Sequence, residues 1–271
     1  MRRHDGWVWC AVAVLAASGC SRLTFVKPKM ERGEYTRVAP EYNVREDKGE
    51  QQRIAAGDRV ALAGQRLQDG RLDEAEAEAR AAIKAEPSSA DGYTILALVA
   101  EQRGNASQAG DYYARAAKIA PTRGDVLNNY AAWMCGNGRA AESMALFDRA
   151  LADPSYGTPG VALANAGSCA VDLGQPRARD DLRRALQLDP ANAVALAALA
   201  QLEYRDGNYL DARAFSERRL AAAPATPQVL QLASQIEQKL GDTAAAARYV
   251  QRISTEFPQN QAVPSGEASQ R

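Results

Sequence analysis

The chain of 271 residues carries 33 basic and 33 acidic side chains, so it has no net charge to attract nucleic acid. Alanine contributes 56 residues and aromatic residues only 6%, which favours close-packed helices over strands. The one histidine, His4, lies at the extreme N-terminus, and Gly-rich phosphate loops are absent from the sequence. His4 lies in a segment that we expect to be removed, so the mature chain has no imidazole, and neither Ser-His or Cys-His catalysis nor a His-based zinc site is expected. The composition therefore predicts a non-enzymatic, all-α protein that uses neither metal nor cofactor.

The first twenty residues have the form of an export signal. Arg2 and Arg3 precede an apolar run over residues 6–17, which is too short to cross a hydrocarbon layer of about 30 Å but suits a signal peptide. Small residues then lead to Cys20, and this arrangement resembles the lipobox of bacterial lipoproteins, where the cysteine is acylated. We expect residues 1–19 to be removed and Cys20 to carry lipid. An ordinary secretory signal cleaved after a small residue is the alternative.

The resemblance to lipoproteins also implies a location. Ser21 stands where an aspartate would suggest retention in the inner membrane. We therefore expect a lipid anchor in the outer membrane with the rest of the chain in the periplasm. Residues 20–53 have mixed charge and few apolar side chains, which is typical of a flexible tether, and residues 261–271 read as a disordered tail.

Residues 54–260 form a repeat array. Two residue types recur along this segment with a period close to 34 residues, which is the length of a tetratricopeptide repeat. The recurring glycines are Gly70, Gly104, Gly138, Gly174, Gly207 and Gly241, and the recurring prolines are Pro87, Pro121, Pro154, Pro190, Pro224 and Pro258. Glycine permits the chain to reverse between two helices, and proline ends the second helix of each unit. A coiled coil would have to run its heptads through these positions, so it is excluded.

Small residues occupy the position in each helix where the two helices of a tetratricopeptide hairpin cross. In the first helices they are Ala63, Ala97, Ala131, Gly167, Ala200 and Ser234, and in the second helices Ala75, Ala109, Ser143, Ala178, Ala212 and Ala246. Small side chains at a crossing let helix axes approach to about 8–10 Å. The sequence therefore predicts a right-handed superhelix of six tetratricopeptide repeats. In the first repeat, Arg59 and Arg66 replace the usual apolar residues, which leaves its packing open.

Two cysteines remain in the expected mature domain. Cys10 leaves with the signal and Cys20 is blocked by lipid, so Cys135 and Cys169 are left to pair in the oxidising periplasm. They lie 34 residues apart near the ends of successive first helices, which run side by side in such an array. We expect a disulfide. Its role is either a rigid seam beside the long link at residues 153–160 or plain stabilisation, and we favour stabilisation.

A narrower resemblance rests on the third and fourth repeats. Residues 127–130 read Leu-Asn-Asn-Tyr, residues 153–156 read Asp-Pro-Ser-Tyr, and residues 165–169 read Asn-Ala-Gly-Ser-Cys. Behind a lipobox and within six repeats, this set resembles the PilF/PilW family of type IV pilus biogenesis lipoproteins. The resemblance implies a pilotin-like outer-membrane lipoprotein that binds the pilus secretin and promotes its localisation or multimerisation.

Tetratricopeptide arrays bind partners in a concave groove lined by their first helices. The side chains expected to face the groove are small, apolar or neutral, and so predict an uncharged partner segment. These are Val60, Thr94, Leu98, Asn128 and Ala132. Asn129 and Asn165 would bond either a ligand backbone or the groove wall. Tyr156 would serve either as an exposed anchor or as packing for the link.

Two other functional classes remain. A general periplasmic adaptor, serving outer-membrane protein insertion or peptidoglycan hydrolases, would use the same scaffold. An enzyme would need a catalytic carboxylate in an apolar pocket, and Asp91, Glu101 and Asp125 near the groove have no spacing that sets them apart from solvated residues. The charged cluster at residues 177–184 is expected to be a solvated helix face.

Overall fold

The computed structural model describes residues 47–258, and this part of the chain is all-helical, with twelve helices and no strand. The helices form six hairpins, each of two antiparallel helices that pack most closely on each other. In chain order the pairs are α2 (Lys48–Gln68) with α3 (Leu72–Ala85), α4 (Ala90–Gln102) with α5 (Ala106–Ile119), α6 (Gly124–Gly136) with α7 (Ala140–Leu151), α8 (Pro159–Asp172) with α9 (Ala178–Leu188), α10 (Ala193–Arg205) with α11 (Tyr209–Ala222), and α12 (Pro227–Leu240) with α13 (Thr243–Glu256).

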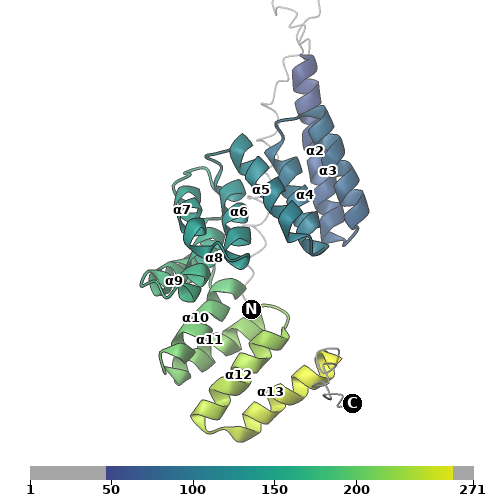
Figure 1. The fold of residues 1–271 in the computed structure, drawn as a ribbon. Helices are drawn as coiled ribbons and strands as arrows, with labels where there is room; N and C mark the ends of the chain where they lie inside the picture. The colour runs from purple at the N-terminus through teal and green to yellow at the C-terminus, as the bar shows by residue number, and fades with distance from the viewer. Residues whose placement is uncertain (1–46, 259–271) are drawn as a thin grey trace, which may run out of the picture. The chain divides into compact units, whose positions relative to one another are not determined.

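Successive hairpins stack on one another in sequence order (Figure 1). The second helix of each hairpin packs against the first helix of the next, and the first helices of neighbouring hairpins also touch. This is the superhelical tetratricopeptide arrangement predicted from the 34-residue period.

The predicted turn glycines have the expected backbone conformation. The six recurring glycines are the residues with positive φ in the described part of the chain, at values between 64° and 84°. A side chain is strained in this left-handed region, so glycine is the residue that fits there. Each recurring proline follows the end of a second helix by two or three residues, beginning with Pro87 after α3. The period in the sequence is therefore the period of turns and links in the fold.

All twelve predicted crossing residues are buried. The crossing residues of the first helices that carry a side chain are at most 4% exposed. Those of the second helices are at most 3% exposed. Gly167 shows how tight a crossing is, because a Cβ placed there would lie 2.6 Å from Cγ of Leu182 in α9. The small side chains thus set the distance between the two helices of each hairpin.

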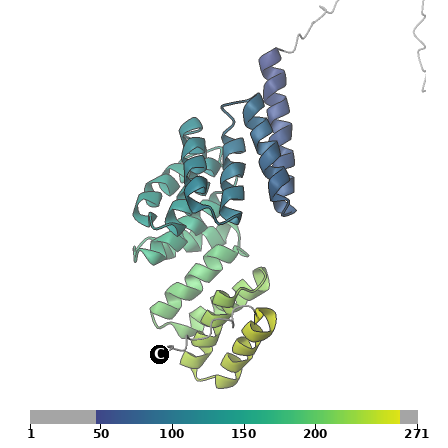
Figure 2. The ribbon, with the colours of Figure 1, turned by 45° about the vertical axis from the view of Figure 1, so that its right-hand side comes forward.

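The first repeat differs from expectation at its N-terminal boundary. The sequence predicts a tether that ends at residue 53, but α2 begins at Lys48, and Figure 2 shows this end of the helix extending beyond its neighbours. The extra turn is exposed, and an ion pair between Glu50 and Arg53, three residues apart, supports it. The helix therefore begins about one and a half turns before the predicted end of the tether, because a solvated extension of a helix has no apolar pattern by which the sequence could indicate it.

Arg59 and Arg66 replace apolar residues in the first repeat, and both form ion pairs with the second helix of the same hairpin. Arg59 donates to Glu78 at 2.6 Å, and Arg66 lies 3.4 Å from Glu74. Long aliphatic stems can cover an apolar seam while the charged heads stay at the surface. The first hairpin therefore closes over Ala63 and Ala75 as the others do.

Candidate functional site

The candidate site is the groove face formed by the first helices of the hairpins. Val60 of α2 and Thr94 of α4, both predicted to face the groove, line one cavity of about 400 Å³ together with Gln65 and Asp91. Thr94 is buried, and its hydroxyl donates to the Ala90 carbonyl at 3.0 Å within its own helix. The cavity therefore combines an apolar wall with the polar side chains of Gln65 and Asp91, while the Thr94 hydroxyl donor is already in use.

Leu98 and Ala132 contribute to the wall of the groove more than to its open surface. Leu98 is half-buried against a cluster that contains Tyr113, Tyr130 and Trp133. Ala132 packs on the larger core that joins the third and fourth repeats. Both residues lie where first helices meet, so a partner would contact them only in part.

An asparagine pair joins the third repeat to the fourth. The Asn165 side-chain amide donates to Oδ1 of Asn128 at 3.1 Å, and Asn128 is 4% exposed. Asn165 thus bonds the groove wall, which is one of the two roles expected for it. Its hydrogen-bond partner is Asn128 and not Asn129. Asn129 is half-buried, and its side chain has no hydrogen-bond partner among residues 47–258. Its side-chain amide is therefore wholly available to a ligand, whereas Asn128 and Asn165 each use part of theirs in their mutual bond.

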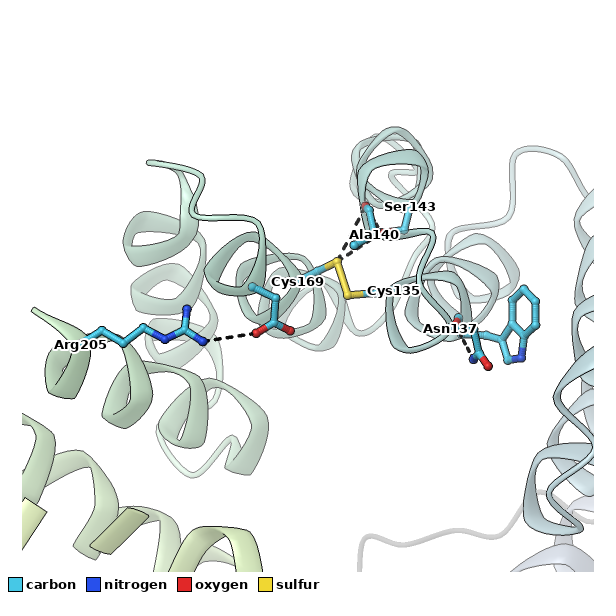
Figure 3. Close-up of a disulfide and its surroundings, with 8 residues drawn as sticks. Cys135, Asn137, Ala140, Ser143, Cys169 and Arg205 are labelled. Atoms are coloured by element: carbon cyan, nitrogen blue, oxygen red, sulfur yellow. Dashed lines mark hydrogen bonds and ion pairs between the residues drawn. A yellow bond between two sulfur atoms is a disulfide. The ribbon is translucent and has the colours of Figure 1, made fainter. Parts of the chain in front are cut away.

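The disulfide lies one to two turns further along the same two helices. Cys135 of α6 and Cys169 of α8 are bonded, with their Cα atoms 6.0 Å apart. Figure 3 shows the bond between the two first helices, with Ser143 of α7 beside it; the Ser143 hydroxyl oxygen lies 3.4 Å from Sγ of Cys169. The asparagine bond and the disulfide together fasten α6 to α8 at two heights.

Acidic side chains at the N-terminal ends of α4 and α6 are held by one arginine. Arg123 donates to both carboxylate oxygens of Asp91, at 2.7 and 3.1 Å, and to Asp125 through Nε at 3.1 Å. The hydrogen bonds to Asp91 and then Asp125 raise the pKa of Arg123 above its ordinary value. The three charges leave a net charge of −1, and both carboxylates are in ion pairs in solvent-accessible positions.

The long link between the third and fourth repeats is organised by Asp153. Its carboxylate accepts hydrogen bonds from the backbone N–H of Gly124 at 2.8 Å and of Ser155 at 2.9 Å, and from the Ser155 hydroxyl. These bonds, the Ser155 hydroxyl first, lower the pKa of Asp153. Tyr156 is half-buried over Gly124, where an added Cβ would lie 2.7 Å from the tyrosine side chain. Tyr156 thus packs the link, and burial raises the pKa of its hydroxyl.

Sequence reasoning missed one set of residues, the buried arginine–glutamate pairs between repeats. The cluster at residues 177–184 is not simply a solvated face, because Asp181 is 4% exposed and Arg179 pairs with Glu203, which is 2% exposed. The same pair recurs as Arg213 with Glu237, 34 residues later in each partner. The equal spacing of 34 residues between the two arginines and between the two glutamates is the feature of the sequence that indicates these pairs.

The predicted lipid site at Cys20, the signal at residues 1–19 and the tail at residues 261–271 lie outside the described residues. Within residues 47–258, no helix combines the length and hydropathy needed to span a membrane. The same residues contain no group of three His, Cys, Asp or Glu side chains placed to hold a metal ion.

The fold and groove define a tetratricopeptide-repeat protein, and a family model described as "Tetratricopeptide repeat" matches residues 61–123. Within that class the chain is PilF/PilW-like. It is 24% identical over 193 residues to the type IV pilus assembly protein PilF of Pseudomonas aeruginosa, covering 71% of this chain and 77% of the relative.

Solved structures show the same likeness. The crystal structure of PilW, described as a widely conserved type IV pilus biogenesis factor, superposes with a TM-score of 0.67 at 29% identity, covering 75% of this chain and 94% of PilW. The structure of Pseudomonas aeruginosa PilF gives a TM-score of 0.66 at 23% identity, covering 77% of this chain and 94% of PilF. The similarity therefore extends over most of the repeat array and most of each relative.

Proposed function

We propose that this chain is a non-enzymatic outer-membrane lipoprotein of type IV pilus biogenesis. In this role it binds the pilus secretin through its first-helix groove and promotes localisation or multimerisation of the secretin. The observation that carries the proposal is the likeness to PilW and PilF over about three quarters of the chain. The lipobox-like sequence ending at Cys20 supports the location in the outer membrane.

The geometry of the groove supports a scaffolding role. An anchor that holds the array near the membrane raises the local concentration of the array around any membrane partner. The cavity lined by Val60 and Thr94 has the size and apolar wall to take one or two uncharged side chains of a bound segment. The fastened α6 to α8 junction would keep the groove from changing shape as the partner binds, which lowers the entropy cost of binding.

A substitution in the cavity tests the proposal. Val60→Arg would place a charge in the cavity between α2 and α4, and we expect it to weaken secretin binding and to lower the amount of heat-resistant secretin multimer in the outer membrane. Ala77→Arg is the matched control, because Ala77 is exposed on α3 and lies away from the groove. Unchanged multimer in cells that carry Val60→Arg would remove this cavity from the binding site.

The general-adaptor alternative predicts a different pattern. Cells without the chain would then show wide envelope defects, with changes in many outer-membrane proteins and pili affected only as a consequence. A proteome comparison of outer membranes with and without the chain separates the two roles. Loss confined to the secretin multimer favours the pilus role.

A further inference from the structure

The second helices of five successive repeats carry an arginine at the same place. In each repeat this arginine comes six residues after the crossing residue of the second helix. These residues, which we call the arginine column, are Arg115, Arg149, Arg184, Arg218 and Arg252. The corresponding residue of the first repeat is Ala81. The column therefore begins at α5 and continues through α7, α9 and α11 to α13.

The arginine column lies on the outer face of the array. First helices of neighbouring repeats pack against one another, whereas each second helix packs on the first helices before and after it. Such a superhelix turns its second helices outward, away from the groove. At 100° per residue, six positions along a helix place each arginine about 120° away from the buried crossing residue. Four of the five arginines are exposed, and Arg252 is half-buried.

Three of the arginines are held by neutral partners. Arg149 donates to the carbonyl oxygen of Pro121 at 2.5 Å, and Arg218 donates to that of Pro190 at 3.0 Å. Each thus reaches the link that precedes its own repeat. Arg115 lies over a tyrosine ring of α4, 5.8 Å from the ring centroid. A neutral partner orients a guanidinium group without neutralising it, so these three groups present their full positive charge.

Carboxylates neutralise the rest of the column only in part. Arg184 lies 3.8 Å from Asp181, whose other carboxylate oxygen is 2.7 Å from Arg177, and Arg252 pairs with Glu256 at 2.7 Å. The side chain of Arg184 is nevertheless 63% exposed. Ion pairs between exposed groups are weak and leave the charge accessible to a stronger partner.

The outer face of these five helices has an excess of positive charge. Its outer positions lie two, five, six and nine residues after each crossing residue. Besides the arginine column, the charged residues at these positions are Lys118, Arg183 and Arg248, which are basic, and Asp111, Asp148, Asp180 and Glu217, which are acidic. Eight basic residues therefore stand beside four acidic ones, on a chain whose 33 basic and 33 acidic residues balance.

We propose that the arginine column binds the surface of a bilayer that contains anionic phospholipids. A guanidinium group matches the geometry of a phosphate, and each basic side chain close to an anionic membrane adds to binding. Packed helices are about 8–10 Å apart, so five successive repeats extend the column over about 40 Å. A row of charges of that length suits an extended anionic surface better than a single small anion.

An apolar pair beside the column favours a membrane over an acidic polypeptide. Leu188 lies one turn after Arg184 on α9 and is 59% exposed, and Val161 of α8 is 42% exposed and lines the same cavity of about 410 Å³. Aliphatic side chains next to basic ones enter the interfacial region of a bilayer, whereas an acidic polypeptide would leave both in water. The proposed lipid on Cys20 would hold the array near the same membrane, and two linked attachments reinforce each other. Binding through the outer face leaves the groove open, so this inference does not depend on the secretin.

Vesicle binding tests the proposal. The chain without its expected signal and lipid, residues 20–271 with Cys20→Ala, is sedimented with vesicles of phosphatidylcholine alone or with about 30% phosphatidylglycerol. We expect binding only to the anionic vesicles, and a loss of affinity of about tenfold or more as salt is raised, because the attraction is screened. The double variant Arg115→Gln/Arg184→Gln should lower the affinity about tenfold or more, since each arginine near an anionic surface contributes about a fivefold factor.

Two matched variants separate the arginine column from net charge. Arg53→Gln/Lys239→Gln removes the same charge from exposed residues of α2 and α12 and should bind as the wild type does. Arg115→Lys/Arg184→Lys keeps the charge and should keep most of the affinity. Circular dichroism checks that every variant keeps the wild-type helix content and melting temperature.

Several results would overturn the proposal. They are absence of binding to the anionic vesicles, equal binding to neutral vesicles, and equal affinity for the wild type and the glutamine variant of the column. Tight binding of polyglutamate without vesicle binding would also overturn it, because the column would then be a site for an acidic polypeptide. None of these results bears on secretin assembly, which the groove variant Val60→Arg tests separately.

Discussion

At the scale of single residues, close packing depends on glycines that the repeat pattern does not mark. Gly110 of α5 lies against the ring of Trp133 in α6, and a Cβ added there would lie 2.3 Å from the nearest ring carbon. Trp133 in turn contacts Tyr113 and Tyr130, with ring centroids 6.4 and 6.0 Å away. One absent side chain thus makes room for the aromatic cluster between the second and third repeats.

Gly110→Ala should therefore destabilise the domain. Because the ring has to move and its neighbours are packed, we expect a loss of about 1–3 kcal/mol in the free energy of unfolding, as for other overpacked cores. Urea denaturation followed by tryptophan fluorescence measures it directly. Gly57→Ala is the matched control, because nothing lies within 4 Å of a Cβ at Gly57 in α2, and alanine there should stabilise the helix by about 0.5–1 kcal/mol.

The Tyr113 hydroxyl makes stability depend on alkaline pH. Burial, followed by its hydrogen bond to Glu101, raises the pKa of Tyr113 well above its ordinary value. The unfolded chain then loses the proton near pH 10 while the folded chain keeps it, so the folded state binds more protons above that pH. The free energy of unfolding should fall by up to about 1.4 kcal/mol per pH unit above pH 10.

Tyr113→Phe isolates this effect. The variant lacks the ionising group, so its free energy of unfolding should fall less steeply than that of the wild type between pH 9 and pH 11. Parallel urea titrations of the two proteins at several pH values give the two slopes. Identical slopes would mean that Tyr113 ionises in the folded state as readily as in the unfolded chain.

At the scale of helices, the seams between repeats change character along the chain. The residue that follows the crossing residue in the second helix of a repeat shows the change. In α7 it is Met144, which is buried among apolar residues, whereas in α9 and α11 it is Arg179 and Arg213. They pair with Glu203 and Glu237, which are almost fully buried in the next first helix. The last three repeats are thus joined by charged seams and the middle ones by apolar seams.

Breaking one charged seam should cost more than breaking a surface pair. Glu203→Ala removes the acceptor of one Arg179 N–H and of the Asn208 amide, while Arg179 keeps its pair with Asp206, so we expect a loss of about 1.5–3 kcal/mol, as for other hydrogen bonds to charged groups. Glu256→Ala removes the exposed partner of Arg252 and should cost less than about 1 kcal/mol. Thermal denaturation of the two variants measures the contrast, and equal losses would show that the seam is solvated.

The disulfide should stabilise the junction of α6 and α8 without being needed for its form. Closing a loop of 34 residues restricts the unfolded chain, which corresponds to about 3–4 kcal/mol in the loop-entropy treatment. The double variant Cys135→Ser/Cys169→Ser should keep the wild-type helix content by circular dichroism but unfold at lower urea concentration. An unchanged midpoint would mean that the Asn128 to Asn165 bond and the core already hold the junction.

At the scale of the whole molecule, the repeat architecture could be predicted from the sequence, whereas the individual side-chain contacts could not. The six repeats, their turns and their crossings follow from glycines, prolines and small residues at fixed spacing, such as Gly104, Pro121 and Ala97. Pairings such as Asn165 with Asn128, or Arg179 with Glu203, depend on which side chains meet across a seam. Spacing places them on neighbouring helices but does not select the partner.

The proposed anchor makes a prediction for the intact protein. If Cys20 carries lipid, Cys20→Ala should release the chain from the outer-membrane fraction, because the lipid on that cysteine is the proposed attachment to the membrane. Cell fractionation followed by immunoblotting checks this. Cys10→Ala is the control, since Cys10 lies within the expected signal, and it should leave the location unchanged.

The most direct test of the proposed role uses the pilus secretin itself. Unboiled outer-membrane extracts of host cells with and without this chain are blotted for the secretin, and the deleted strain is complemented with the wild type, Val60→Arg or Ala77→Arg. A role in secretin assembly predicts that the high-mass secretin band collapses to monomer without the chain while other outer-membrane proteins persist. It also predicts that the wild type and Ala77→Arg restore the band and Val60→Arg does not. A high-mass band that persists in the deleted strain would contradict that role.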